Sequence, residues 1–290
     1  MRFHARTDLP PAAAQDADVR RGLTEILLEP ARRHGATHVV LLYYAADPAA
    51  VRSVHRALRR ECRRSGLVVV TALLADGTHY RDLEHPEPAA RRQRHRYDVS
   101  AHPFVVDALV SGRLAHRSRA DLVASLDQDP RAASAVSDAL VAGRFADAGI
   151  PTGGREIRSA GEWVLHTLRD LAADEAEPGD ADLARLLWVM QTPRVRDAAW
   201  SGIERGTAPA HVRIWADAVR RAPEALAAAP AALLGWAAWQ AGDGALAWVA
   251  VDRCLRASPG YRLADYLAAI LQGAVPPEMW EGGFDWSAGL

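Results

Sequence analysis

The chain has 290 residues with 35 basic and 36 acidic side chains, which give a formal net charge of -1 at pH 7. This length is enough for one large domain or two ordinary ones. The balanced charge argues against general binding to nucleic acid or anionic lipid, which depends on clustered cations. Every basic residue is an arginine, which excludes enzymes that need a lysine in a phosphate-binding loop or a Schiff base.

The sequence contains no apolar run that approaches the ~18 residues of a membrane-spanning helix. The first residues, MRFHAR, carry charges where a signal peptide has its apolar core. Cys62 and Cys254 lie in different predicted helices, and a chain of this length needs no disulfide. We therefore expect a cytoplasmic protein that does not enter a membrane.

The first part of the chain predicts a small sheet. Alternating apolar and polar residues over 2–7 predict a strand, and a helix is expected over 18–33. The apolar run 38–44 predicts a strand that is central in its sheet and covered on both faces. Asp47 and Pro48 then form a helix start, because the carboxylate can cap N–H groups and the proline sits where no N–H is needed.

The helix that starts there is expected over 48–64 and leads to a second buried strand over 67–74. A strand–helix–strand connection of this length is almost always right-handed, with parallel strands. The Asp-Gly dipeptide at 76–77 predicts a tight turn into a hairpin strand over 78–81. The polar, proline-bearing stretch 84–97 predicts a loop.

Beyond this loop the chain is expected to be helical almost to its end. The helices fall near residues 101–111, 118–128, 130–148, 155–174, 181–190, 193–205, 209–221, 230–241, 244–257 and 261–273. The predicted fold class is an α/β layer with a small mixed sheet, followed by a larger all-α region of helical hairpins. We divide the chain into an α/β sheet domain (1–98), a helical connecting segment (99–154) and an all-α Trp-rich domain (155–290).

The end of the helical region resembles a tetratricopeptide unit. Leu234, Gly235, Ala247 and Pro259 fall at the spacing of that repeat, around a turn at 242–244. One such unit cannot bury its own faces, so neighbouring helices are expected to complete the stack.

All nine tryptophans lie between Trp163 and Trp286. Trp236, Trp239 and Trp248 fall on two neighbouring helices, where they could line a groove for a partner protein, because tryptophan is a common anchor of such interfaces. The alternative is that these indoles fill the gaps between helices.

A small-ligand site is the second hypothesis. Tyr43 and Asp47 lie at the carboxyl end of a predicted parallel strand, where open α/β sheets bind ligands. The adjacent hairpin adds His79 and Arg81, which suit a phosphorylated ligand, but no glycine-rich phosphate loop accompanies them. The competing interpretation is that Asp47 caps a helix and the tyrosine packs.

The sequence predicts no catalytic, cofactor or metal site. Several histidines lie between the hairpin and the helices, namely His79, His85, His95, His102 and His116. They lack the i, i+4 spacing of a zinc-binding helix, and no cysteine accompanies them. The arginine-rich stretch 91–96 gives few phosphate contacts and predicts a solvated loop. No nucleophile motif of the G-x-S-x-G type is present.

Three stretches carry a family resemblance: SAHPFVVDALVSGRLAHRSRADLVASL at 100–126, VRDAAW at 195–200 and the segment 233–280, which includes GDGALA. They are similar to actinobacterial proteins catalogued only as a domain of unknown function (number 4192). The resemblance implies a cytoplasmic bacterial protein without an established activity.

Members of that family begin with a further helix and strand, and carry paired tryptophans and a Cys- and Pro-rich segment after the hairpin. The corresponding place here, 78–86, has neither Trp nor Cys, so the resemblance implies a shortened copy that has lost this segment. The expected function is a non-enzymatic scaffold or regulatory module that binds a protein partner, a full-length paralogue or copies of itself through its Trp-rich helical surface. The alternative is an enzyme or sensor for a small phosphorylated ligand at the sheet edge.

Overall fold

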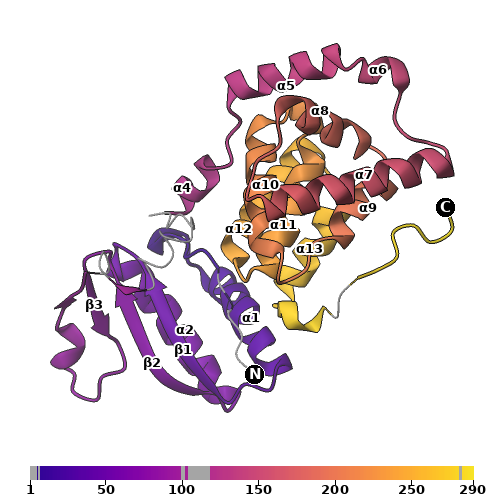
Figure 1. Ribbon diagram of the computed structural model, residues 1–290. Helices are drawn as coiled ribbons and strands as arrows, with labels where there is room; N and C mark the ends of the chain where they lie inside the picture. The colour runs from indigo at the N-terminus through magenta and orange to yellow at the C-terminus, as the bar shows by residue number, and fades with distance from the viewer. Residues whose placement is uncertain (1–4, 6, 99–101, 104–117, 281–282) are drawn as a thin grey trace. The chain divides into compact units, whose positions relative to one another are not determined.

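The computed structural model describes residues 5, 7–98, 102–103, 118–280 and 283–290. The chain divides into two compact units, residues 1–115 and 116–290, which run from indigo to purple and from magenta to yellow in Figure 1. We call them the sheet unit and the helical unit and describe each by itself. The strand predicted over 2–7 and the helix predicted over 101–111 lie mostly outside the described residues.

The described part of the sheet unit contains α1 (Ala17–Arg33), β1 (His38–Tyr44), α2 (Pro48–Arg64), β2 (Val68–Ala75), β3 (His79–Asp82) and β4 (His95–Arg96). Strand β1 and helix α2 begin and end at the predicted residues. Helix α2 starts for the expected reason, because the Asp47 carboxylate accepts a hydrogen bond from the Ala49 N–H at 2.8 Å and Pro48 follows the cap. Strand β4 lies in the stretch 84–97, so the prediction of a loop was wrong there.

The strands form one sheet in the order β1-β2-β3-β4. Strands β1 and β2 are parallel, whereas β2–β3 and β3–β4 are antiparallel. The predicted small mixed sheet, with a βαβ unit and a hairpin, is therefore confirmed.

Both long helices of this unit pack on one face of the sheet (Figure 1). The i, i+3, i+4 spacing of apolar residues on α2 places them on one side of that helix. The resulting core contains Leu23, Leu28 and Ala31 of α1, Val51, Val54, Leu58 and Cys62 of α2, and Tyr43, Ala72 and Leu74 of the sheet.

The other face of the sheet is open and apolar. Val40 and Leu42 of β1 are each 54% exposed, Tyr44 is 76% exposed, and Val68 and Val70 of β2 are 52% and 59% exposed. In the described sheet, β1 also occupies an end position. The prediction of a central strand covered on both faces was wrong, because alternate residues of the apolar run point to the core and to solvent.

A β-bulge interrupts the pairing of the two parallel strands. Val39 pairs with Val69, but the next residue, Val40, pairs with Thr71. Val70 is therefore an extra residue in β2.

The bulge explains why β2 exposes alternate residues before it and buries alternate residues of the same parity after it. Val68 and Val70 point to the open face, whereas Ala72 and Leu74 are buried, although strict alternation would place all four on the same side. The extra residue reverses the alternation after the bulge.

The helical unit contains α4 (Arg119–Ala124), α5 (Pro130–Ala142), α6 (Phe145–Ala148), α7 (Gly154–Ala173), α8 (Asp180–Val189), α9 (Pro193–Ser201), α10 (Ala208–Arg221), α11 (Ala228–Gln240), α12 (Gly244–Ala257) and α13 (Arg262–Gln272). The helix predicted over 130–148 is split at Arg144, whose φ of 52° is left-handed. Helix α5 packs on α8 and α10, so this part of the expected connecting segment belongs to the helical unit.

Helix α11 is the centre of the helical core. Nearly all of its residues are buried, and it packs closely on α10 and α12. Gly235 allows this approach, since a Cβ there would lie 2.9 Å from Leu267 Cδ2 and 3.5 Å from Ala250 Cβ. The predicted helical hairpin of α11 and α12 is thus present, while its assignment as a tetratricopeptide unit stays a prediction.

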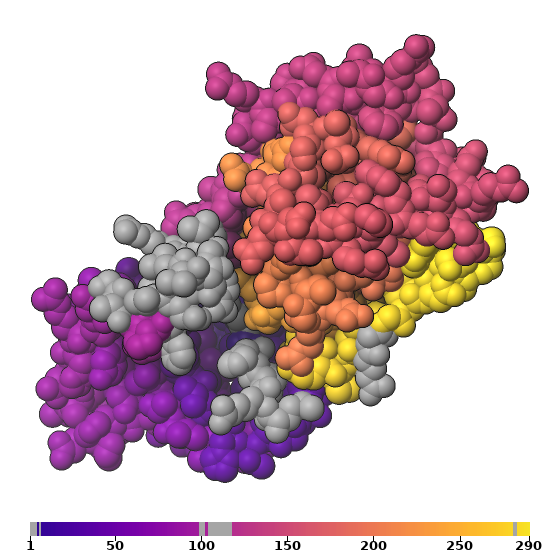
Figure 2. All heavy atoms as spheres, viewed as in Figure 1, coloured from indigo at the N-terminus to yellow at the C-terminus, as the bar shows by residue number. Residues whose placement is uncertain are grey.

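The segment after α13 also packs on the helical core. Trp286 is 8% exposed, and Arg194 donates a hydrogen bond to its carbonyl oxygen at 3.0 Å. Figure 2 shows the atoms of the helical unit, from magenta to yellow, packed closely together on the face drawn. In the part of the chain that is described, no helix has the length and apolar character that would let it cross a bilayer.

Candidate functional site

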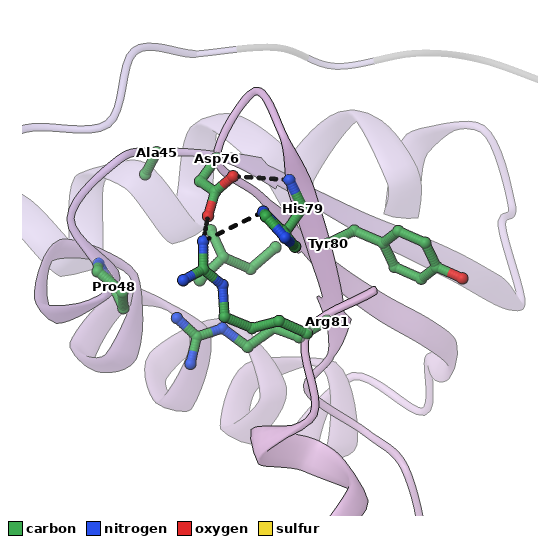
Figure 3. A pocket seen from close by; sticks show the side chains of 8 residues that line it. Ala45, Pro48, Asp76, His79, Tyr80 and Arg81 are labelled. Carbon is green, nitrogen blue, oxygen red and sulfur yellow. Dashed lines mark hydrogen bonds and ion pairs between the residues drawn. The ribbon is translucent and has the colours of Figure 1, made fainter. Parts of the chain in front are cut away.

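A shallow hollow lies in the sheet unit where β1 and β2 end beside the hairpin. Its lining consists of Ala45, Pro48, Leu74, Asp76, His79, Tyr80, Arg81 and Arg94. Figure 3 shows the side chains of His79 and Arg81 gathered near Asp76, whereas the Tyr80 ring points away. His79 and Arg81 share one face of β3 because they are two residues apart. The hairpin therefore brings two of the predicted ligand-site residues together.

Asp76 organises this hollow. Its carboxylate accepts hydrogen bonds from the His79 N–H at 2.8 Å and the Thr78 N–H at 3.0 Å, and Arg94 Nη2 lies 2.6 Å away. The backbone N–H groups of His79 and Thr78 are the main cause that holds the pKa of Asp76 well below its usual range. The Arg94 charge is thus already paired, and Asp76 works as the cap of the turn.

The other two predicted ligand residues do not line the hollow. The Tyr43 side chain is in the core at 8% exposure, and the Asp47 carboxylate caps α2. The hollow encloses about 10 Å³, which holds about one water molecule. It is therefore too small to enclose a phosphorylated ligand.

Tyr43 belongs instead to a network of polar side chains on the covered side of the sheet. Its hydroxyl lies 3.2 Å from His55 Nδ1, His55 Nε2 lies 3.3 Å from Glu84, and Arg59 Nε lies 3.0 Å from the same carboxylate oxygen. Burial is the main cause that raises the pKa of Tyr43 and lowers that of His55, although Glu84 offsets part of the latter shift. A protonated phenol and a neutral imidazole then join α2, β1 and the segment after β3.

The tryptophans expected to form a partner groove are mostly in the core. Trp236 is fully buried and Trp239 is 4% exposed, and Trp239 Nε1 donates a hydrogen bond to the Val275 carbonyl oxygen at 3.0 Å. Trp236 packs edge-on against Trp200, with ring centres 5.0 Å apart. These two indoles offer no surface to a partner, and only Trp248 of the three is partly exposed.

The helical unit has a larger cavity of about 130 Å³ between the starts of α9, α11 and α13. Arg196 and Tyr261 supply polar groups to its wall. However, Arg196 Nε already donates to Asp197 at 3.0 Å, and its guanidinium lies 5.5 Å from the centre of the Tyr261 ring. The charge in this wall is therefore paired within the protein.

Among the described residues of the sheet unit, all the exposed large apolar side chains except Ile26 lie on the open sheet face. Beside the valines and Leu42, a row of paired residues crosses all four strands: Tyr44 pairs with Ala75, Ala75 with Tyr80, and Tyr80 with His95. The Tyr80 and His95 rings stack with centres 5.2 Å apart. Aromatic residues beside an apolar patch are characteristic of protein interfaces.

Comparison with known proteins places the chain in a family. A family model described as Domain of unknown function (DUF4192) matches residues 1–278. The chain belongs to this family. No curated protein and no solved structure matches this DUF4192 chain.

Within the described residues of this DUF4192 chain, no three His, Cys, Asp or Glu side chains are grouped in a way that could hold a metal ion. His79, His85 and His95 are among those residues, while His116 lies outside them. The pairings of Asp76 with Arg94 and of His55 with Glu84 were not predicted from the sequence. The Asp-Gly turn signalled only the place of Asp76 in the turn, and neither partner had a local signal.

Proposed function

We propose that this DUF4192 chain is a non-enzymatic cytoplasmic scaffold or regulatory module that binds a protein partner. The observation that supports the proposal is the open face of the sheet unit, where Val40, Leu42, Tyr44, Val68 and Val70 are 52 to 76% exposed. Together they expose on the order of 500 Å² of apolar surface, a size at which a patch is often functional. The proposed docking surface is this sheet face in place of the Trp-rich helical surface.

The chemistry of the described residues also favours binding over catalysis. Cys62 and Cys254 are fully buried, and burial is the main cause that raises the pKa of both thiols, that of Cys254 to about 12. A thiol with a raised pKa is a poor nucleophile near neutral pH. The hollow near His79 encloses about 10 Å³, so the small-ligand alternative has little room there.

The test is photo-crosslinking in the host cell. A photo-reactive phenylalanine analogue replaces Tyr44, which is 76% exposed on the open face, or Ile26, which is 57% exposed on α1. We expect protein adducts, identified by mass spectrometry, from position 44 and not from position 26. Adding Leu42→Arg to the position-44 chain should remove them, because a buried unpaired charge opposes docking.

Two results would contradict the proposal. The first is a position-44 probe that reacts only within its own chain, which would mean that the face is covered intramolecularly. The second is equal adduct formation at both positions, which would indicate random encounters.

A further inference from the structure

The open sheet face fits a second copy of this chain, an inference that rests on the proposed function. We infer that two chains pack face to face through Val40, Leu42, Tyr44, Val68 and Val70, so that their sheets form a sandwich about a two-fold axis. Such an interface places the same patch on both sides and must therefore be compatible with itself.

The charge distribution meets that condition. In the described strands, the positions on the open face carry aliphatic, aromatic, threonine and histidine residues and one carboxylate, Asp82, which pairs in register with Leu73. Asp82 is on β3, away from the β1–β2 centre of the patch. Two such faces therefore meet without opposing like charges at their centre, where a desolvated charge would be most costly.

The area is also appropriate. The five exposed aliphatic and tyrosine side chains supply on the order of 500 Å² per copy, and flanking residues such as Leu73 and Tyr80 bring the face towards the roughly 800 Å² per partner of a standard interface. Tyr44 is the natural anchor because it is the most exposed of the five and because tyrosine is enriched among interface hot spots.

The covered side of the sheet shows why the open side suits another sheet. Helices α1 and α2 already provide one apolar layer, and a sheet can bury its second face against another sheet about 10 Å away. The result is a symmetric stack of helices, sheet, sheet and helices.

The experiment is sedimentation velocity on the purified full chain over a micromolar concentration series. We expect a monomer–dimer equilibrium whose dissociation constant rises ~100-fold with Leu42→Asp, because a carboxylate would be buried in the interface. Leu42→Arg should do the same, and mixing the two variants should restore a dimer because the opposite charges then face each other. Ile26→Asp, on α1 and 57% exposed, is the matched control and should dimerise normally.

A wild-type chain that remains monomeric overturns the inference, and so does dimerisation that Leu42→Asp leaves unchanged. Alkylation of a Val70→Cys chain then shows whether the proposed function fails together with the dimer. The native thiols are fully buried, so the new thiol reports on the face. Rapid alkylation of a monomer leaves the face open for a different protein, and the proposed function stands. Slow alkylation means that the chain covers its own face, and both proposals fail.

Discussion

Helix α11 of the helical unit is buried almost all round, whereas the described sheet of the sheet unit is covered on one face only. Helix α11 is enclosed by its neighbours, and Trp236 at its centre is fully buried. In β1, by contrast, Tyr43 is 8% exposed and the adjacent Tyr44 is 76% exposed. The number of apolar residues in a segment therefore does not predict where an apolar surface is exposed. A face is exposed only where no other helix or strand packs on it.

The unfolding of the two units can be followed with different probes. All nine tryptophans lie within residues 116–290, so tryptophan fluorescence reports on the unfolding of the helical unit alone. Hydrogen exchange of the β1 and β2 amides reports on the sheet unit.

The largest expected effect is in the helical core. Trp236→Ala should lower the free energy of unfolding of the helical unit by about 3 to 5 kcal/mol, because it leaves a large cavity in a packed interior. Urea titration followed by fluorescence measures it. Trp248→Ala is the control, and its effect should be clearly smaller because Trp248 is only half-buried. Equal losses would mean that α11 is not the centre of the core.

The second effect is a pH dependence of the same unit. Burial lowers the pKa of His211 from 6.5 to about 4. Below pH 6.5 the unfolded chain therefore binds a proton that the folded chain does not, and stability falls as the pH drops towards 4. The loss reaches about 3 kcal/mol in total.

Urea titrations between pH 7 and pH 5 measure this slope, in a range where most carboxylates remain ionised. His211→Gln keeps an N–H donor for the Gly202 backbone, which the imidazole bonds, and should flatten the curve. An unchanged slope in that variant would show that another group titrates.

A smaller effect is expected in the sheet unit. Tyr43→Phe removes the hydroxyl that lies 3.2 Å from His55 Nδ1 and should destabilise β1 and β2 by about 1 kcal/mol. Hydrogen exchange of the strand amides detects it. Tyr44→Phe makes the same chemical change one residue later, on the open face, and should leave exchange unaltered. If both variants behave alike, the polar network of Tyr43 and His55 does not stabilise the sheet.

The smallest effect tests whether the open face is open. Leu42→Ala should change the stability of the monomeric sheet unit by less than about 0.5 kcal/mol, measured by hydrogen exchange at low protein concentration. Leu41→Ala, which points to the core side, should cost more. A larger loss for Leu42→Ala would show that this face is packed within the chain.

The sequence predicted the bounds of strands and helices better than it predicted which of their faces are buried. The bounds of β1 and α2 were correct because a long apolar run and an Asp-Pro cap are local signals. The open face could not be predicted, because an unbroken apolar run is compatible with two buried faces or with one. Strand β4 was missed because its two residues, His95 and Arg96, carry no apolar alternation.

The candidate site shows the same limit. His79 and Arg81 lie together on β3, as the predicted hairpin strand implied, while their role as ligand residues stays a prediction. Arg94 pairs with Asp76 across 18 residues of sequence, and no local pattern encodes that contact. The burial of Trp236 and Trp239 did have a signal, since α11 is apolar around its whole circumference, which is typical of an enclosed helix.

The bulge at Val70 gives β2 a position at which the loss of one residue can be tolerated. Deleting one codon within a strand ordinarily turns every later side chain to the opposite side. Here Val70 has no partner on β1, so its loss would join Val69 directly to Thr71 and leave Ala72 and Leu74 pointing inward. Position 70 is thus a place in β2 where the length of the polypeptide can shorten by one residue while the strand keeps its phase.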